Sequence, residues 1–394
     1  MADLRVPFGD ATAGKQVGGY VAPGCEAVRQ AFAVNLHTGA DLGAAFAVFH
    51  RGEFIADLWG GHADEARSQP LQRNALFNLW SSTKGLSATC IAMLVDRGLL
   101  HYESPVAQYW PEFAANGKGA VTVGQLMSHQ AGVCGPRQTV TIEDYYTHDR
   151  VASLLASQEP FFDPGSTWGY HALALGSLAD ELVRRVDGRT MGAFFTAEVA
   201  HPLVLDCFLG LPESEDHRQV RVFPPNGANN PTGDIPNQSA YRAAIENPML
   251  DPGWPNTRSW RTAGLAGGGG SATARALAHL YGLLANGGEL ADTRLLSATT
   301  VAEAARERIA GADQVSGVYR RYAAGFQLNV NGRMGPYEGS FGHDGWGGIM
   351  GFADPERRLG VGYVSNTMWI GEPTSPDPRV SRLLSATYAA LDNA

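Results

Sequence analysis

The sequence predicts an α/β protein in which the strands come from both ends of the chain and the helices mainly from its middle. Strand patterns fill residues 43–59 and return after residue 324, and helical patterns dominate between them. The simplest assembly joins residues 1–85 and 275–394 in one α/β domain, interrupted by a mainly helical domain of residues 86–274. The chain has 394 residues, more than the roughly 250–300 at which a single core usually stops growing. One two-lobed unit and two domains are both compatible with that length.

The N-terminal part is predicted to contain a helix followed by a β-hairpin. The helix is expected over residues 23–37, with a proline at its start and a glycine just after its end. Residues 43–50 (GAAFAVFH) are apolar, as in a buried strand, and Arg51-Gly52 provides a turn into a return strand over residues 53–59. These two strands supply the first part of the expected sheet.

The remaining patterns predict a central helix and a return to strands. Residues 76–80 lead directly into residues 81–99, which are apolar on most faces, and a helix of that kind is usually buried. Residues 212–261 are rich in Pro, Asn and Gly and are predicted to form long loops that border the functional site. The other predicted elements are helices over residues 121–127, 173–186, 272–285 and 378–391, and strands over residues 324–329, 347–353 and 360–365.

The composition excludes several classes of partner. A formal net charge of −9 argues against nucleic acid, because binding to the phosphate backbone needs clustered Lys and Arg. No stretch approaches ~18 uninterrupted apolar residues, so no membrane span is expected. Residues 1–19 lack the apolar and basic regions of a secretory leader. We therefore expect a cytoplasmic protein whose four widely spaced cysteines are reduced; its oligomeric state is not predicted.

The strongest chemical signal is Ser81-Ser82-Thr83-Lys84, an S-x-x-K pattern at a strand-to-helix junction. Residues three apart share a helix face, so Lys84 can reach the Ser81 hydroxyl. The positive end of the helix dipole favours an alkoxide and an acyl oxyanion there. The alternative is an N-capping serine followed by a surface lysine. The apolar surroundings argue against it, because burial lowers the pKa of a lysine toward the range of a base.

Two later segments add candidate residues. Tyr170 lies in GSTWGYHA and is expected to open the following helix; the alternative is an ordinary core aromatic. Trp168, two residues earlier, either lines the site or packs in the core. Residues 342–345 (GHDG) precede a strand-like run, and the alternative there is a glycine-rich turn.

Taken together and in order, these segments resemble the serine β-lactamase/penicillin-binding-protein superfamily, nearest its class C-like branch and the family VIII carboxylesterases. The family's S-x-x-K corresponds to Ser81 to Lys84, and its tyrosine motif, Y-x-N in class C enzymes, corresponds to Tyr170-His171-Ala172. The third motif, K-T-G or H-x-G, corresponds to His343-Asp344-Gly345. The resemblance spans about residues 45–366. It implies a β-lactamase-like fold, with a central antiparallel sheet flanked by helices, a mainly helical domain, and the active site between them.

The departures from the family pattern concern substrate recognition. Ala172 stands where lactam-directed relatives carry an asparagine that contacts the substrate's side-chain amide, and His343 stands where lactamases carry a lysine. A neutral or partly charged imidazole holds a β-lactam carboxylate less strongly than an ammonium does. Trp346-Gly347-Gly348 offers a second register for the third motif, because some family VIII members carry W-G-G there. We prefer His343-Asp344-Gly345, whose spacing to the following strand better resembles the family.

The resemblance implies an acyl-enzyme mechanism. Ser81 attacks the ester carbonyl after either Lys84 or Tyr170, as phenolate, has taken its proton. The backbone N–H groups of Ser81 and Trp346 hold the oxyanion. Tyr170 protonates the leaving alcohol and then activates water. His343, Asp344, Gly345, Trp346 and Trp168 are the expected substrate-binding residues beside this triad.

The expected function is therefore that of a serine carboxylesterase acting on a small-molecule ester. Two alternatives stay open: a β-lactamase, D-amino-acid peptidase or amidase of the same fold, and a catalytically silent scaffold or ligand sensor. The histidines show no HExxH motif and no ligand-like cluster, so no metal is expected. The glycine run at residues 267–270 lacks the GK[ST] of a phosphate loop, so no nucleotide cofactor is expected either.

Overall fold

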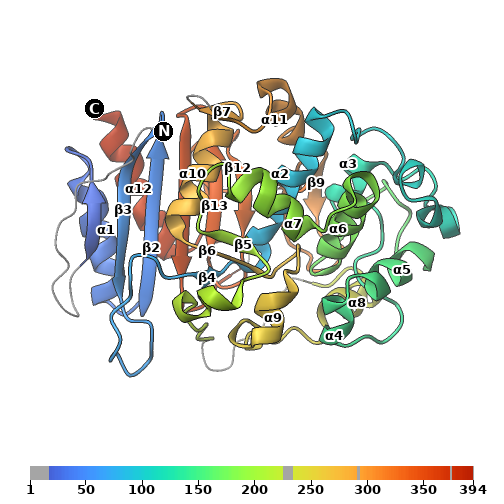
Figure 1. Ribbon diagram of the computed structural model, residues 1–394, viewed down its shortest axis with the longest axis horizontal. Helices are drawn as coiled ribbons and strands as arrows, with labels where there is room; N and C mark the ends of the chain where they lie inside the picture. Colours follow the sequence, from blue (N-terminus) through green and yellow to red (C-terminus); the bar gives the residue numbers. More distant parts are fainter. Residues whose placement is uncertain (1–16, 225–233, 291–292, 373–374, 394) are drawn as a thin grey trace.

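A nine-stranded antiparallel sheet forms one side of the molecule, and a region rich in helices adjoins it (Figure 1). The computed structural model describes residues 17–224, 234–290, 293–372 and 375–393. The strand order is β1-β3-β2-β14-β13-β12-β11-β10-β9. The strands are β1 (Gly18–Val21), β2 (Gly43–His50), β3 (Glu53–Gly61), β9 (Ile309–Ala312), β10 (Tyr319–Tyr322), β11 (Gln327–Leu328), β12 (Phe341–Asp344), β13 (Met350–Asp354) and β14 (Leu359–Ser365).

Strands from the two ends of the chain meet in the middle of this sheet, where β2 pairs with β14. Successive residues of β2 point to opposite faces. Phe46 and Val48 pack with the helices α1 (Glu26–His37) and α12 (Pro378–Asp392), whereas Ala47 and Phe49 belong to the core on the side of α10 (Ala274–Ala285). Helices cover both faces, which explains why the GAAFAVFH strand is apolar throughout.

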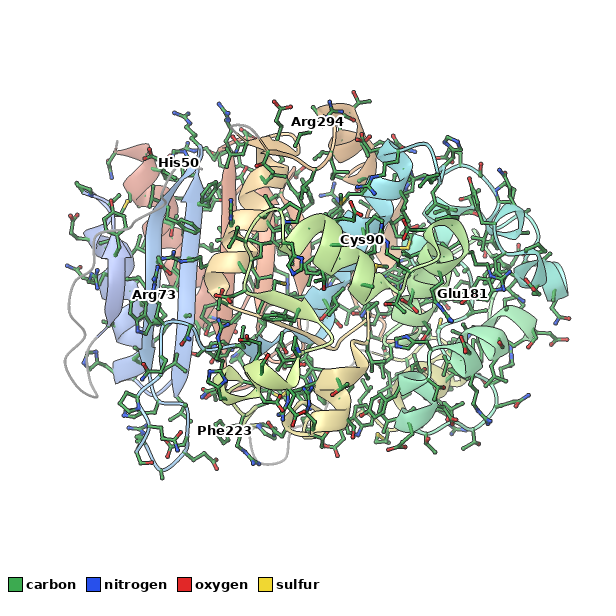
Figure 2. All side chains as sticks on the ribbon, in the orientation of Figure 1. His50, Arg73, Cys90, Glu181, Phe223 and Arg294 are labelled. Atoms are coloured by element: carbon green, nitrogen blue, oxygen red, sulfur yellow. The ribbon has the colours of Figure 1, made fainter. Side chains whose placement is uncertain are left out.

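The helix α2 (Thr83–Asp96) runs through the centre of the molecule (Figure 1). Every residue from Thr83 to Leu94 is buried, as the apolar pattern predicts. Side chains surround this helix, which carries the buried Cys90 (Figure 2). All four cysteines are free and buried. The helices of the adjoining region are α3 (Val123–Met127), α4 (Ile142–Tyr146), α5 (Asp149–Ser157), α6 (Ala174–Asp187), α7 (Met191–Phe195), α8 (Gln238–Ile245) and α9 (Arg258–Ala263).

Two small sheets and one further helix complete the fold. The first sheet has the order β4-β6-β5 and leads into α2; its strands are β4 (Phe77–Asn78), β5 (Cys207–Leu209) and β6 (Gly270–Ala272). The second pairs β7 (Glu289–Leu290) with β8 (Thr293–Arg294) and precedes α11 (Ala298–Ala304). No helix within the described ranges is long and apolar enough to cross a membrane.

The architecture predicted from the sequence is present: a central antiparallel sheet flanked by helices (Figure 1). The hairpin and the helices expected over residues 23–37, 121–127, 173–186 and 272–285 are present within a few residues of the predicted bounds. The short helix α3 begins after Thr122, whose side chain forms a capping box with Gln125. The division between domains at residues 85 and 275 stays a prediction.

Several element predictions are wrong. Residues 212–261 are not loops throughout, because they contain α8 and α9, whose first turns are capped by Asn237 and Thr257. The strand expected over residues 347–353 begins only at Met350, since Gly347 and Gly348 adopt φ of 95° and 97° and form a turn. The strand expected over 324–329 shortens to β11, and the strands β9, β10 and β12 were not predicted.

The leader prediction rests on residues 1–19, of which residues 1–16 lie outside the described part.

Candidate active site

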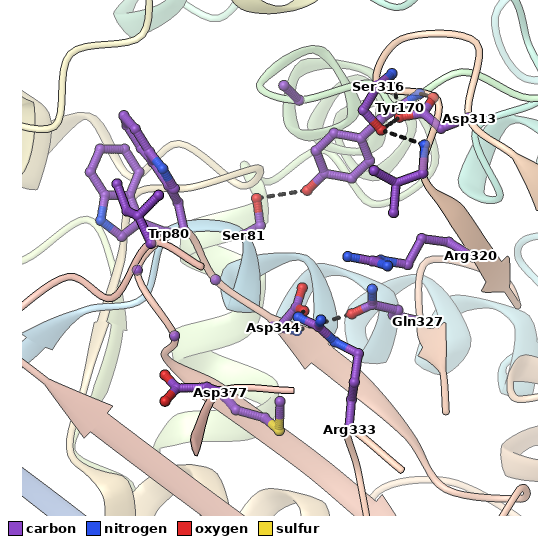
Figure 3. A pocket seen from close by; sticks show the side chains of 18 of the residues that line it. Trp80, Ser81, Tyr170, Asp313, Ser316, Arg320, Gln327, Arg333, Asp344 and Asp377 are labelled. Carbon is purple, nitrogen blue, oxygen red and sulfur yellow. Dashed lines mark hydrogen bonds and ion pairs between the residues drawn. The ribbon is translucent and has the colours of Figure 1, made fainter. Parts of the chain in front are cut away.

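Ser81 lies in a short 3-10 turn, Trp80–Ser82, between β4 and α2. The chain bends sharply there: Trp80 has φ of 47°, in the left-handed region that a bulky residue rarely adopts. The Leu79 N–H donates to the Gly270 carbonyl oxygen at 2.8 Å, which fixes the start of the turn. This bend presents the Ser81 side chain to a pocket at the start of α2 (Figure 3).

Lys84 lies directly beneath Ser81 and is completely buried. Its Nζ donates to Ser81 Oγ at 3.1 Å and to the Gly267 carbonyl oxygen at 2.7 Å. Burial lowers the pKa of Lys84 to about 7, against an opposing effect of the Asp344 carboxylate. Near neutral pH a large fraction of Lys84 is therefore unprotonated and able to accept the Ser81 proton.

Tyr170 is the second residue that contacts the Ser81 hydroxyl (Figure 3). Its hydroxyl donates to Ser81 Oγ at 2.7 Å, and its ring lies 4.9 Å from Lys84 Nζ. Burial raises the pKa of the Tyr170 phenol above its usual value. The directions of the two pKa shifts thus favour Lys84 over Tyr170 as the group that takes the Ser81 proton. The prediction that Tyr170 opens a helix is wrong, because α6 begins only at Ala174.

The third motif ends the strand β12 beside the nucleophile turn. Ser82 Oγ donates to the His343 carbonyl oxygen at 2.9 Å and to the Ile349 carbonyl oxygen at 3.2 Å. A Cβ on Gly345 would lie 2.4 Å from the Leu79 carbonyl oxygen, so only glycine fits at this approach. The buried serine and the glycine therefore join the S-x-x-K turn to the third motif.

The His343 side chain is buried, with 1% of its surface exposed. Its Nδ1–H donates to the Asp344 carbonyl oxygen at 2.6 Å. Burial, together with the nearby Lys84, lowers the pKa of His343 to about 4, so the imidazole is neutral at neutral pH. His343 is not among the described residues that line the pocket, and its expected contact with substrate stays a prediction.

Asp344 and the next two residues do line the pocket. An oxygen of the Asp344 carboxylate lies 2.6 Å from Arg333 Nη2. Burial would raise the pKa of Asp344, but the positive charges of Arg333 and Arg320 outweigh it and lower the pKa. The pocket therefore has a carboxylate in its wall, paired with arginine (Figure 3).

The residues after Asp344 form a tightly held turn. The Gly345 N–H donates to the Ile349 carbonyl oxygen at 2.7 Å, and the Gly348 N–H donates to the Gly345 carbonyl oxygen at 3.0 Å. Arg379 Nη2 donates to the Gly347 carbonyl oxygen at 2.9 Å from below. The turn carries Trp346, whose ring packs edge-on against Trp80 with 5.0 Å between ring centroids. The Ser81 and Trp346 N–H groups remain the predicted oxyanion donors.

The pocket has a volume of about 280 Å³ and is lined by both polar and apolar groups. Of the predicted site residues it includes Ser81, Trp168, Tyr170 and the segment 344–346. Sequence reasoning missed several of the residues that line the pocket, among them Trp80, Tyr241, Arg320, Tyr322, Arg333 and Trp369. Tyr241 lies within residues 212–261, which were expected to border the site, and Trp80 adjoins the nucleophile; the other four have no local sequence signal.

Within the described residues, no group of three or more His, Cys, Asp or Glu side chains is arranged to hold a metal ion.

Comparison with known proteins places these features in context. Residues 28–384 match the sequence profile of the family described as Beta-lactamase. The chain is 35% identical over 377 residues to the Esterase/beta-lactamase LipL of Mycobacterium tuberculosis, covering 90% of this chain and 84% of that protein. The structure of a family VIII carboxylesterase superposes with a TM-score of 0.90 at 44% identity, covering 95% of this chain and 100% of the other. A penicillin-binding protein homolog from Caulobacter crescentus superposes with a TM-score of 0.90 at 40% identity, with the same coverage.

Proposed function

Because the chain belongs to the beta-lactamase family of serine hydrolases, we propose that it is a carboxylesterase that hydrolyses carboxylic esters through an acyl-enzyme on Ser81. The observation that carries the proposal is the position of Ser81 Oγ between two proton carriers, 3.1 Å from Lys84 Nζ and 2.7 Å from the Tyr170 hydroxyl. A hydroxyl held in this way is the arrangement that nucleophilic catalysis requires.

Acylation begins when unprotonated Lys84 takes the Ser81 proton and Ser81 Oγ attacks the ester carbonyl carbon. The negative charge that develops on the carbonyl oxygen is held by the Ser81 and Trp346 N–H groups. The bond to the alcohol then breaks, and Tyr170 gives its proton to the leaving alkoxide. At this stage Lys84 is an ammonium and Tyr170 a phenolate.

Deacylation reverses these two proton transfers. The Tyr170 phenolate takes a proton from water, and the resulting hydroxide attacks the acyl carbon. Ser81 Oγ leaves and recovers its proton from the Lys84 ammonium, so both proton carriers return to their starting states. The raised pKa of Tyr170 makes its phenolate a strong base for this step.

Two features of the site favour an ester over a β-lactam. Ala172 presents only a methyl group where an amide would hold a lactam side chain. His343 is neutral and buried, so it offers no positive charge to a β-lactam carboxylate. An ester needs only the oxyanion donors and Tyr170, so these features leave its chemistry intact.

A β-lactamase or amidase of the same fold is the second candidate. It is favoured by the similarity to LipL, which is named as both an esterase and a beta-lactamase, and by the similarity to a penicillin-binding protein homolog. The relative rates on an ester and on a chromogenic cephalosporin separate it from the esterase.

The nucleophile is tested by labelling the protein with a fluorophosphonate probe and measuring its intact mass. One adduct is expected, on the peptide that contains Ser81, and none is expected in Ser81→Ala. Ser82→Ala is the matched control: its hydroxyl lies outside the pocket lining, so labelling should persist, at a reduced rate because the bonds to the His343 and Ile349 carbonyl oxygens are lost. Labelling of Ser81→Ala at the rate of the unaltered protein, or no labelling of the unaltered protein, would exclude the proposed nucleophile; the second result would favour the catalytically silent alternative.

A further inference from the structure

The peptide that carries Tyr170 lies outside regular secondary structure. Tyr170 follows the half-buried loop after Pro160 and precedes α6 by three residues. No helix or strand ladder therefore fixes its backbone, yet its hydroxyl lies 2.7 Å from Ser81 Oγ. The backbone N–H groups of residues 169–171 are all held by two distant residues, His129 and Asp313.

His129 contacts the peptide groups on both sides of Tyr170. Its carbonyl oxygen accepts from the Gly169 N–H at 3.1 Å, and its Nδ1 accepts from the His171 N–H at 3.1 Å. The side chain is completely buried, and the backbone adopts φ of 66°, in the left-handed region that histidine tolerates better than most residues. Burial lowers the pKa of His129 well below its usual value, so Nδ1 stays an unprotonated acceptor. Both acceptors of His129 therefore bind one short segment.

Asp313 accepts a hydrogen bond from the Tyr170 N–H, which lies between the N–H groups of residues 169 and 171. Its Oδ1 accepts from the Tyr170 N–H at 2.8 Å, and the same oxygen accepts from the Val315 N–H at 2.9 Å. Its Oδ2 accepts from the Ser316 N–H at 3.0 Å and from Ser316 Oγ at 2.5 Å, so the carboxylate is fixed from the other side. Figure 3 shows the Tyr170 ring between Ser81 and the Asp313–Ser316 pair.

We propose that His129 and Asp313 are positioning residues for Tyr170: together they hold three consecutive backbone N–H groups, 169 to 171, and so keep the phenol on Ser81. The inference rests on the proposed role of Tyr170 as a proton carrier. His129 lies outside the pocket lining; Asp313 lines the pocket, but both of its carboxylate oxygens are engaged by Tyr170, Val315 and Ser316. A displacement of about 1 Å at a catalytic group can cost on the order of a hundredfold in rate, so loss of either anchor should act on kcat rather than on KM.

The first experiment compares His129→Ala with His129→Asn on the full-length protein, using a p-nitrophenyl ester. Asparagine places an acceptor oxygen where Nδ1 stands and tolerates positive φ, whereas alanine does neither. His129→Ala should lower kcat by ten- to a hundredfold, on the order expected for a misplaced group, and His129→Asn should recover most of that loss. Equal kcat values for the two variants, whether both keep their activity or both lose it, would overturn the proposal.

The second experiment is a double-mutant cycle. Each of the substitutions Asp313→Ala, His129→Ala and His129→Asn is combined with Tyr170→Phe. If the anchors act only through the phenol, adding either anchor substitution to Tyr170→Phe should change kcat by less than about threefold, because residues that act as a unit are not additive. Fully additive losses would mean a general structural role and would overturn the inference.

Asp180→Ala is the matched control for Asp313→Ala. Asp180 is also a buried carboxylate that accepts a backbone N–H, from Met191 at 2.6 Å, but it lies outside the pocket lining. It should lower the unfolding midpoint without the kcat-specific loss. If Asp313→Ala does not fold, the two His129 variants decide the question. Full activity of Tyr170→Phe alone would instead contradict the proposed mechanism, which keeps the two failures distinct.

Discussion

Lys84 is the residue whose environment most directly sets the chemistry. Its ammonium form is disfavoured by complete burial, while contacts with the Gly267 carbonyl oxygen and Ser81 Oγ fix the position of Nζ. The S-x-x-K spacing predicts this contact because residues three apart share a helix face. The sequence leaves open whether Lys84 or Tyr170 takes the Ser81 proton, since a pKa depends on the three-dimensional surroundings of each group.

The pH dependence of ester hydrolysis tests the assignment of Lys84. Its pKa is lowered to about 7, and only the unprotonated amine accepts a proton. The value of kcat/KM for an uncharged ester should therefore rise with pH below about 7 and level off above it, since this quantity reports the free enzyme. Tyr170→Phe should be slower but keep the same ascending limb. A profile without change between about pH 5.5 and 8 would contradict the role of Lys84.

At the scale of secondary-structure elements, the site depends on how closely the end of β12 approaches the turn before α2. Ser82 and Gly345 form this junction. Neither role is visible in the sequence, because a serine after the nucleophile and a glycine after a strand both occur for many local reasons.

Gly345→Ala tests the junction. The added Cβ would meet the Leu79 carbonyl oxygen at 2.4 Å, so the backbone must shift and carry Trp346 away from Ser81. We expect kcat/KM to fall by on the order of a hundredfold, measured on the same ester. Gly339→Ala is the matched control, because nothing lies within 4 Å of a Cβ at that position. Equal activity of the two variants would show that the close approach is not needed.

Which elements the sequence predicts follows from how local their signals are. The helix α10 has strong apolar periodicity, β2 is a continuous apolar run followed by a turn, and α3 has a capping box, so all of these are predictable. By contrast, β9 (IAGA) and β10 (YRRY) are only four residues long and half-exposed, and neither carries a run of large apolar residues. Their strand conformation comes from pairing in a sheet whose partners lie far away in the chain.

At the scale of the whole molecule, the site exists because segments from the entire chain meet. Ser81, Tyr170 and Asp344 come from three separate regions of the chain. Asp344 reaches the site because β12 pairs within the sheet in which β2 and β14 join the two ends of the chain. Family resemblance predicts that these motifs meet. It does not predict Arg320 and Arg333, whose positions in the pocket wall depend on the path of β10 and of the connection after β11.

Arg379 connects the C-terminal helix to this site. Its guanidinium pairs with Asp41 and Asp377 and donates to the Gly347 carbonyl oxygen, and 2% of its side chain is exposed. Arg379→Met should cost about 3–5 kcal/mol, because it leaves buried carboxylates unpaired. Urea unfolding measures this loss, with Arg382→Met, an exposed residue of the same helix that donates one hydrogen bond to Asn35, expected to cost only about 1 kcal/mol. Similar midpoints for the two variants would contradict the structural role of Arg379.

The measurement that tests the central claim most directly compares kcat/KM for an uncharged phenyl ester and for a chromogenic cephalosporin under the same conditions. Each lost contact to a charged or amide group costs about 1.5–3 kcal/mol. With Ala172 in place of an amide and a neutral, buried His343, the ester should be preferred by at least about a hundredfold. A kcat/KM for the cephalosporin equal to or above that for the ester would contradict the assignment of this protein as a carboxylesterase.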